Sequence, residues 1–244
     1  GTGTSNAPEL ATVPLQFWFC RNPGLALPLI ALQYHEVKVK ISFSAFTDVM
    51  QADGVTDNTF DLSTHKLWAD YIYLDTDERR RFAQVSHEYL IEQLQFQNES
   101  SASTFELNFN HPVKELIWTQ PATKTVTNDV NHGAANAKKL EDGNYYIKLN
   151  GHDRFAQRNR SYFTRAQVWE HHTGYGGITT SDSIAVYSFA LKPEEHQPSG
   201  TCNFSRIDNA QLIQDGTAQP LRIYAVNYNV LRIMSGMGGL AYSN

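Results

Sequence analysis

Apolar and polar residues alternate along much of the chain, which is the pattern of β-strands that bury one face. Every second residue is apolar between residues 37 and 43, with lysine or serine in between. The same alternation returns around residues 90–96, where glutamines occupy the other face, and again from Phe105 to Phe109. Denser runs of β-branched and aromatic residues, typical of strands covered on both faces, occupy residues 71–74, 113–118, 184–191 and 221–234.

The number of these segments predicts the fold class. With two further apolar segments near Phe17 and Leu29, the chain has about eight or nine strands, as a jelly roll requires. Helix is scarce, and the clearest candidate covers residues 77–84 with Thr76 as its cap. We therefore expect an all-β fold, an eight-stranded antiparallel jelly-roll sandwich with long loops and one or two short helices. Because no change of composition follows residue 12, residues 1–12 are interpreted as a linker or cut end and residues 13–244 as a single domain.

Three long connections separate the predicted strands, at residues 121–144, 150–183 and 192–201. Loops of more than about 12–15 residues in a compact domain are usually functional or partly structured. On a sandwich such loops gather at the two ends, where they can face a partner. The connection at 150–183 contains several basic residues and histidines, namely Arg154, Arg158, Arg160, Arg165, His171 and His172.

Composition and charge exclude several classes of function. The 244 residues include 20 lysines and arginines against 25 aspartates and glutamates, so the net charge of −5 lacks the positive field that nucleic-acid binding requires. A hydrophobic fraction of 41% excludes disorder. No apolar run reaches the length of about 18 residues that a membrane-spanning helix needs.

Motifs for catalysis, metals and cofactors are missing from the sequence. The nine histidines form neither a His-x-His nor a His-Glu-x-x-His pattern, and there is no Gly-x-Ser-x-Gly elbow. Cys20 and Cys202 could form a disulfide, but two buried reduced thiols are favoured. The glycines at 236, 238 and 239 are expected to let a last turn pass close to another backbone. We therefore predict no catalytic residue, no metal site and no cofactor.

Three asparagines begin an Asn-x-Ser sequon, the acceptor sequence for N-glycosylation: Asn98, Asn159 and Asn203. The amino end has neither a basic start nor an apolar middle, so we expect no secretory signal. The three matches are therefore interpreted as chance, although they are the candidate glycosylation sites of this sequence.

Three stretches of the sequence are more distinctive than the alternating pattern of apolar and polar residues. Residues 14–37 open the domain and contain Phe-Trp-Phe-Cys-Arg-Asn-Pro-Gly, residues 111–118 are His-Pro-Val-Lys-Glu-Leu-Ile-Trp, and residues 227–244 contain Met-Ser-Gly-Met-Gly-Gly-Leu-Ala-Tyr. Together with residues 199–208, they strongly resemble the carboxyl-terminal half of the major capsid protein of nucleocytoplasmic large DNA viruses, of the phycodnavirus and iridovirus type. The resemblance is colinear from about residue 13 to the end.

The resemblance implies a structural protein and not an enzyme. Members of this family have two consecutive jelly rolls and form homotrimers, the pseudo-hexagonal capsomers that tile an icosahedral shell over an inner membrane. The chain would then be the second jelly roll, located in the virion capsid shell and assembled in the cytoplasm of the host cell. Its expected partners are copies of itself, the missing amino-terminal jelly roll and minor capsid proteins, with no direct contact to nucleic acid and no segment across the membrane.

The loop at 150–183 supplies the candidate subunit contacts, which are Arg154, Arg158, Arg160, Arg165, His171 and His172. Two alternative functions stay open at this point. One is a carbohydrate-binding jelly-roll module, a lectin or an enzyme with two carboxylates at hydrolytic spacing, that uses aromatic residues such as Tyr162, Trp169 or Tyr175, because lectins and capsid sandwiches share an architecture. The other is a minor capsid protein of the same viruses.

Overall fold

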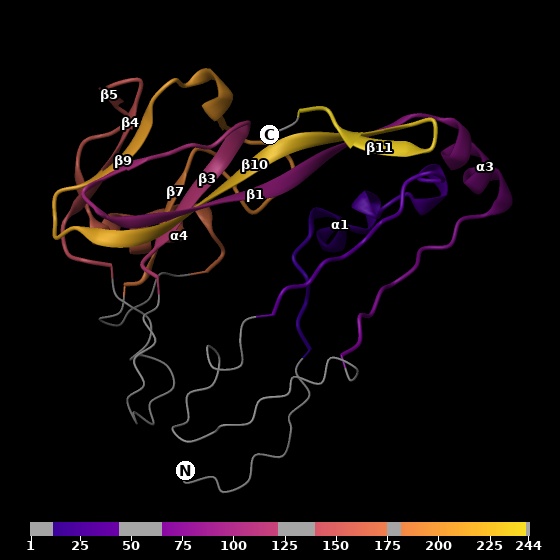
Figure 1. Ribbon diagram of the computed structural model, residues 1–244, viewed down its shortest axis with the longest axis horizontal. Helices are drawn as coiled ribbons and strands as arrows, with labels where there is room; N and C mark the ends of the chain where they lie inside the picture. The colour runs from indigo at the N-terminus through magenta and orange to yellow at the C-terminus, as the bar shows by residue number, and fades with distance from the viewer. Residues whose placement is uncertain (1–11, 44–64, 122–139, 175–181, 243–244) are drawn as a thin grey trace, which may run out of the picture.

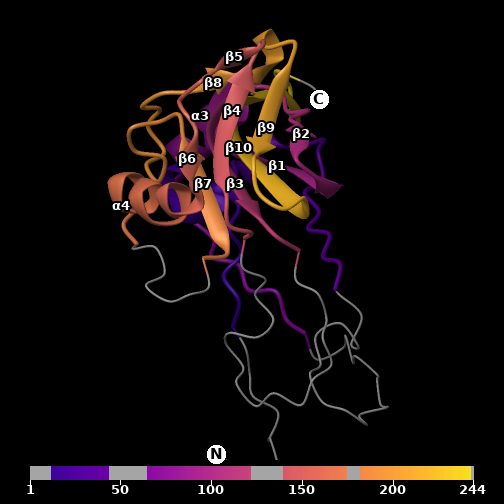
Figure 2. The same cartoon turned by 90° about the vertical axis from the view of Figure 1, so that its left-hand side faces the viewer.

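The computed structural model of the chain describes residues 12–43, 65–121, 140–174 and 182–242. Two antiparallel sheets face each other in a sandwich, and the two longest strands, His87–Ala102 and Gln219–Met234, extend together beyond one end of it (Figures 1 and 2). The strands are β1 (His87–Ala102), β2 (Thr104–Glu106), β3 (Pro112–Thr119), β4 (Asn144–Leu149), β5 (His152–Asp153), β6 (Arg158–Asn159), β7 (Ile184–Ser188), β8 (Cys202–Asn203), β9 (Ala210–Gln214), β10 (Gln219–Met234) and β11 (Met237–Leu240). The helical segments are α1 (Trp18–Arg21), η1 (Pro23–Leu25), η2 (Leu29–Ala31), α3 (Thr76–Gln84), η4 (Tyr162–Ala166), α4 (Gln167–His171) and η5 (Phe204–Arg206).

The order of the strands is that of a jelly roll. The first sheet runs β1-β10-β3-β7, with β11 added on β10 and β8 on β3. The second sheet runs β2-β9-β4-β5, with β6 added on β4. Each main path has four strands. Most neighbours in these paths are far apart in sequence, as β1 and β10 are over the register from His87↔Ile233 to Ala102↔Gln219. The predicted eight-stranded antiparallel jelly-roll sandwich is therefore confirmed.

The hydrophobic core lies between the two sheets. Trp118 of β3 is fully buried, with its ring 6.0 Å from that of Tyr145 on β4 and 5.2 Å from that of Phe163 in η4. Burial of one large aromatic side chain stabilises a fold by roughly 2–3 kcal/mol. Trp118 therefore joins both sheets and the helical segment that follows β6. Other members of the core include Phe105, Leu107, Phe109, Leu116, Ile147, Leu212, Leu221 and Ile223.

Side-chain amides of β1 hold the segment that crosses from the second sheet to the first. The Gln95 amide donates to the carbonyl of Asn110 at 2.7 Å, and its oxygen accepts from the Asn110 N–H at 3.0 Å. Gln97 similarly donates to the carbonyl of Glu106 and accepts from the N–H of Asn108. These side-chain hydrogen bonds replace the backbone hydrogen bonds that a neighbouring strand would make with the segment 106–110. The glutamine face of β1 is thus the inward face.

The apolar face of β1 consequently points outward. Leu94 is 62% exposed and Phe96 is 54% exposed. The strand predicted around residues 90–96 is present, but the expectation that its apolar side would be the buried one is wrong. Glutamines are selected on the inner face because they satisfy backbone groups of the segment 106–110, which has no strand of its own beside β1.

Four other predicted strands do not form. Residues 37–43 and 71–74 lie in no sheet, and their apolar side chains, such as Phe43 and Tyr73, are exposed. The segments near Phe17 and Leu29 are the short helices α1 and η2. Alternation alone cannot form a strand, because a strand needs a neighbour to pair its backbone groups.

Two strands that the apolar pattern did not single out complete the second sheet. These are β4 and β9, which pair with each other from Tyr145↔Gln214 to Leu149↔Ala210. The connection 150–183 is partly structured, since it contains β5, β6, η4 and α4. Most of the connection 121–144 lies outside the described residues. Helix α3 is present as predicted, but Asp75 and not Thr76 caps it by accepting from the Glu78 N–H at 2.8 Å.

The β10–β11 hairpin docks on the amino-terminal segment. Its two-residue turn, Ser235 and Gly236, has positive φ at both positions (53° and 82°), which suits a hairpin of this length. A Cβ at Gly236 would lie 2.5 Å from the ring of Tyr34, and the Tyr34 N–H donates to the Gly236 carbonyl. Ala31, Leu32 and Ile233 form a second, small core beside this turn. The glycine therefore permits the close approach that the sequence predicted.

Candidate functional site

Two of the six candidate contact residues are tied to one internal carboxylate. Arg160 is buried, pairs with Asp142 at 2.7 Å, lies 3.9 Å from Asp182 and donates to the carbonyl of Leu140. Arg165 reaches the same Asp182 at 3.0 Å, and half of its side chain is exposed. Because Asp182 is itself buried, the two arginines neutralise it from inside the subunit.

Two other arginines of the connection are exposed. Arg154 is fixed by its backbone, which donates to the carbonyl of Ile147, and its side chain lies at the surface. The Arg158 guanidinium stacks 4.5 Å from the centroid of the Tyr162 ring, a cation–π geometry that holds the charge at the surface. These are the arginines of the group that can reach a neighbouring molecule without leaving an internal ion pair.

The two adjacent histidines tie α4 to other elements. His171 Nδ1 is 3.1 Å from the carbonyl oxygen of Leu191. His172 Nε2 is 3.1 Å from Glu115 Oε2 on β3, and His172 Nδ1 is 3.2 Å from Glu194 Oε1. The Glu115 and Glu194 carboxylates raise the pKa of His172 above its ordinary value, although burial acts in the opposite direction. Sequence reasoning placed both histidines at the surface and did not show that they bridge three segments.

A buried group of charges on the outer face of the first sheet was not predicted. Lys114 is 1% exposed, and its amine is 2.8 Å from Glu92 Oε1 on β1. The other carboxylate oxygen of Glu92 is 2.8 Å from Arg21 of α1, and His196 Nδ1 is 3.7 Å from Oε1. A β-bulge explains the geometry, because Val226 pairs with Glu115 but Asn227 pairs with Val113, which leaves Lys114 as the extra residue.

This group fastens two segments, α1 and the 192–201 connection, to strands β1 and β3 of the sheet. Glu92 and Lys114 are 22 positions apart, and Arg21 is 71 positions from Glu92. No local spacing rule connects such residues. The only signal in the sequence was the charged pair Lys114 and Glu115 within the run 113–118, whose other residues are apolar.

Beside these charges the outer face carries an apolar surface, which we name the apolar shelf and define as Leu94, Phe96, Ile117, Tyr224 and Val226; the described residues leave the first two exposed and the other three partly exposed. The pairing register places these residues in two adjacent rows, Leu94↔Val226 and Phe96↔Tyr224↔Ile117. The Phe96 and Tyr224 rings are 5.0 Å apart. The outer face of an antiparallel sheet is ordinarily polar, so a two-row apolar surface there is an exception.

The sequon asparagines have local structural roles at two positions. The side-chain oxygen of Asn159 accepts from the Ser161 N–H at 3.0 Å, and that of Asn203 accepts from the Ser205 N–H at 3.1 Å. Both are Asx turns, so an Asn two residues before a Ser is explained by backbone capping. Asn98 is exposed on β1. Whether any of the three bears sugar stays untested.

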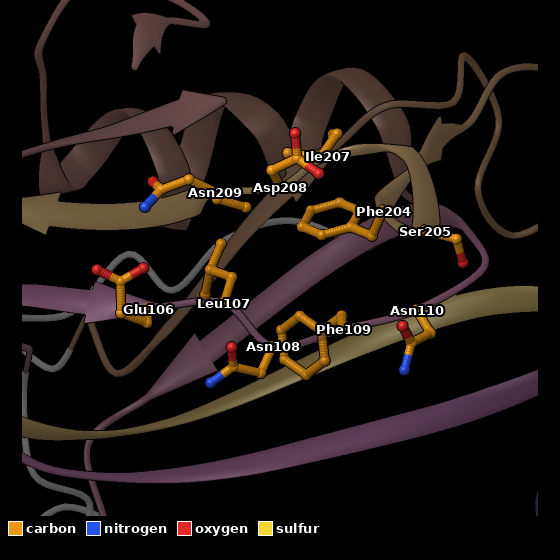
Figure 3. A pocket seen from close by; sticks show the side chains of 11 residues that line it. Glu106, Leu107, Asn108, Phe109, Asn110, Phe204, Ser205, Ile207, Asp208 and Asn209 are labelled. Atoms are coloured by element: carbon orange, nitrogen blue, oxygen red, sulfur yellow. The ribbon is translucent and has the colours of Figure 1, made fainter. Parts of the chain in front are cut away.

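A hollow of about 290 Å³ lies between residues 106–110 and 204–210 (Figure 3). Leu107, Phe109 and Phe204 line it together with polar residues. Figure 3 shows Glu106 at one end of it and Asn110 at the other. Glu106 accepts from the Gln211 amide at 2.6 Å, so this carboxylate is already bound within the protein.

Three further observations concern metal binding, membrane-spanning helices and the two cysteines. Within the described residues, no group of three or more His, Cys, Asp and Glu side chains is arranged to hold a metal ion. No described helix has the length and apolarity to cross a membrane. Both cysteines are free; Cys202 is half-buried, and burial raises the pKa of its thiol, whereas Cys20 is exposed, contrary to the expectation of two buried thiols.

Comparison with known proteins decides the family. The family described as large eukaryotic DNA virus major capsid protein matches residues 78–239, and the family described as major capsid protein N-terminus matches residues 2–75. The chain belongs to the major capsid proteins of large eukaryotic DNA viruses. The predicted resemblance is thereby confirmed.

Relatives within this capsid protein family are similar over nearly the whole chain. The major capsid protein of Pyramimonas orientalis virus is 53% identical, covering 99% of the chain and 63% of the relative. That of Paramecium bursaria Chlorella virus 1 is 43% identical, covering 95% and 66%. The chain thus spans about two thirds of the length of these relatives. The alignment with the Chrysochromulina ericina virus protein extends over 380 positions, more than the 244 residues of the chain, so that relative has residues within the matched region that this chain lacks.

Solved structures of capsid proteins share the fold. PBCV-1 VP54, fitted into a reconstruction of the virophage Sputnik, matches with a TM-score of 0.74 and 37% identity over 95% of this chain and 70% of that one. A quasi-atomic model of the PBCV-1 virus capsid matches with a TM-score of 0.71 and 39% identity, over the same shares of the two chains. The first of these neighbours is a crystal structure fitted into a virus reconstruction, and the second is part of a viral capsid.

Proposed function

We propose that this chain is a structural subunit of an icosahedral capsid of a large DNA virus, located in the virion shell. Membership in the major capsid protein family is the observation that carries the proposal. The packed core of the sandwich and the exposed connections at its ends suit a subunit that assembles with others. The ion pairs inside the subunit, which hold its segments together, suit the same role. The role is structural and not catalytic, and the subunit assembles with copies of itself into trimeric, pseudo-hexagonal capsomers.

The sandwich is the second of two consecutive jelly rolls in this proposal, and the amino-terminal jelly roll is its partner. Support comes from the apolar residues of 37–43 and 67–73, which alternate or cluster as in strands but are not assigned to a sheet among the described residues. Trp68 is 85% exposed and Tyr73 is 91% exposed. A second β domain packed on these segments would bury their exposed apolar side chains. Minor capsid proteins remain expected partners on the inner side of the shell.

The candidate subunit contacts between residues 154 and 172 stay predictions, and the structure favours the exposed residues among them over the buried ones. Arg154 and Arg158 are exposed and can reach a neighbour, so charge reversal at Arg158 should weaken assembly while leaving the fold intact. Charge reversal at Arg160 should instead damage the fold, because Asp142 and Asp182 would face a third carboxylate. Far-UV circular dichroism separates these two outcomes.

Light scattering tests the proposed function. We expect the chain alone to be a folded monomer at micromolar concentration. We expect a trimer when the chain is joined with the segment of the Pyramimonas orientalis virus relative that it lacks. Monomers in both preparations, with native circular dichroism, would contradict the proposal. Specific binding of the monomer in a glycan array would favour the carbohydrate-binding alternative, and low abundance in purified particles would favour a minor capsid protein.

A further inference from the structure

Part of the connection between β7 and β8 crosses the outer face of the first sheet, and we name it the strap and define it as residues 191–199. Its two ends meet, because the Leu191 N–H donates to the Ser199 carbonyl at 3.4 Å and the Lys192 N–H donates to the Ser199 hydroxyl at 2.9 Å. A segment of this length whose ends lie close together is an Ω-loop. Figure 2 shows it beside α4. The middle of the strap can therefore move while its ends stay joined.

The side chains that hold the strap in place are mainly histidines: His171, His172 and His196. The Tyr228 hydroxyl adds a hydrogen bond of 3.4 Å to the carbonyl of His196. Of residues 191–199, all of which the structure describes, Pro193 alone is buried. Apolar packing thus contributes little to the closed position. Histidine is the side chain whose charge ordinarily changes between pH 5 and 8, so the strap depends on groups that titrate near neutral pH.

His172 has a carboxylate at each of its ring nitrogens. Nε2 is 3.1 Å from Glu115 Oε2 on β3, and Nδ1 is 3.2 Å from Glu194 Oε1 on the strap. A neutral imidazole has one N–H donor and one lone pair, whereas the charged ring has two donors. Both contacts are therefore attractive only when the ring is protonated at both nitrogens. The two carboxylates accordingly raise the pKa of His172.

The two carboxylates respond differently when the ring loses a proton. Glu115 Oε2 and His172 Nε2 are both buried, and neither has another hydrogen-bond partner among the described residues. The Glu194 side chain is 39% exposed and also accepts from the N–H and the hydroxyl of Thr173. A buried carboxylate without a donor is the costlier state, so the remaining proton stays at Nε2. The lone pair of Nδ1 then faces the Glu194 carboxylate and repels it toward water.

The other charged groups around His172 do not change this order. Among the described residues, no carboxylate oxygen other than those of Glu115 and Glu194 lies within 4.0 Å of the His172 nitrogens. The neighbouring charges have partners of their own: Glu170 with His171, Lys192 with Glu195, and Lys114 and His196 with Glu92. Burial, and then the carboxylates of Glu92 and Glu115, raise the pKa of Tyr228 to about 12, so this hydroxyl stays neutral.

We propose that His172 is the latch of a pH-sensitive strap, which is closed on the outer face when the ring is protonated and opens at Glu194 when the proton is lost. Opening gives water access to the Glu92–Lys114 pair, which His196 contacts, and to Glu115 beside the apolar shelf. The surface that the outer face presents thus changes with pH. The switch does not depend on the proposed capsid function, because all of its contacts lie within one chain.

Hydrogen–deuterium exchange of the full chain, measured by mass spectrometry, tests the latch. The Thr173 amide donates to Glu194 at 3.0 Å and reports on the latch, whereas the amides of residues 191–199 report on the strap. Protection factors, which remove the intrinsic effect of pH on exchange, are compared at about pH 6 and about pH 8.5. We expect both sets of amides to lose protection several-fold at the higher pH. Equal protection at the two pH values would overturn the proposal.

Alanine variants of two adjacent, exposed strap residues separate the latch from the general charge of the strap. Glu194→Ala removes the acceptor on the strap but keeps the contact between His172 and Glu115. Its strap should be open at both pH values, while its unfolding free energy should still decline as the pH rises. Glu195→Ala removes only a pairing with Lys192, so its exchange should keep the native dependence on pH. A native dependence in Glu194→Ala, or its loss in Glu195→Ala, would overturn the proposal.

Discussion

The buried ion pair between Glu92 and Lys114 allows a quantitative test of how the first sheet is held together. The variant Glu92→Gln removes the carboxylate 2.8 Å from the Lys114 amine, while the lysine stays 1% exposed. Among the described residues, no other carboxylate lies within 4.0 Å of that amine. The Tyr228 ring, with its centroid 5.5 Å away, is the remaining attraction. Breaking a buried pair in this way costs about 3–5 kcal/mol of unfolding free energy.

The reciprocal variant should cost less. In Lys114→Met, Glu92 keeps the Arg21 guanidinium at 2.8 Å, and that arginine is half exposed to water. We therefore expect a loss of roughly 2–3 kcal/mol. The double variant Glu92→Gln/Lys114→Met removes both buried charges, so it should be less destabilised than Glu92→Gln and fall well below the sum of the single losses.

Urea unfolding followed by far-UV circular dichroism and tryptophan fluorescence gives the free energies. Glu88→Gln is the matched control, because Glu88 also lies on β1 and pairs with Arg232 at 2.8 Å, but with 59% and 51% of the two side chains exposed. Its loss should stay below about 1 kcal/mol. If Glu92→Gln cost no more than Glu88→Gln, or if the double variant showed the full sum of the single losses, the reasoning about burial would be refuted.

Two further predictions follow from the same structure. The pKa of His172 is raised in the folded protein above the ordinary histidine value of about 6.5. Between these two pKa values the folded protein binds more protons than the unfolded chain does. The stabilisation by His172 is therefore complete below about pH 6.5 and is lost as the pH rises through the folded pKa. Urea unfolding across this pH range should show that the unfolding free energy of the native protein declines with rising pH and that of His172→Gln does not. Parallel dependence of the two free energies on pH would contradict this prediction. Gly200→Ala should lower the unfolding free energy by about 2 kcal/mol, because Gly200 has φ of 144° and a Cβ there would lie 2.7 Å from the Phe189 carbonyl oxygen. Gly151→Ala is the control, because Gly151 has φ of 81° but a Cβ there would have no atom within 4 Å. It should cost only the conformational strain of about 1 kcal/mol. Equal losses for the two glycines would show that the contact at Gly200 relaxes.

The sequence by itself determined the fold class, the family and the two central strands of the first sheet. β3 and β10 were predictable because most of their residues are apolar and many are β-branched or aromatic, a composition that does not depend on which partner covers them. The glycine turn at 236 was also readable, because a positive φ is a local requirement.

Only the tertiary structure decided which faces are covered and which charges are free. Alternation in β1 shows that Leu94 and Phe96 share a side, but inward and outward depend on the segment 106–110 that the glutamines bind. The same is true of residues 37–43, whose pattern is that of a strand although no strand lies beside them in the described chain. Arg160 looked like a surface arginine until two aspartates, 18 and 22 positions away, were placed around it. Burial and ion pairing arise between residues distant in the chain, and local periodicity contains no information about those distances.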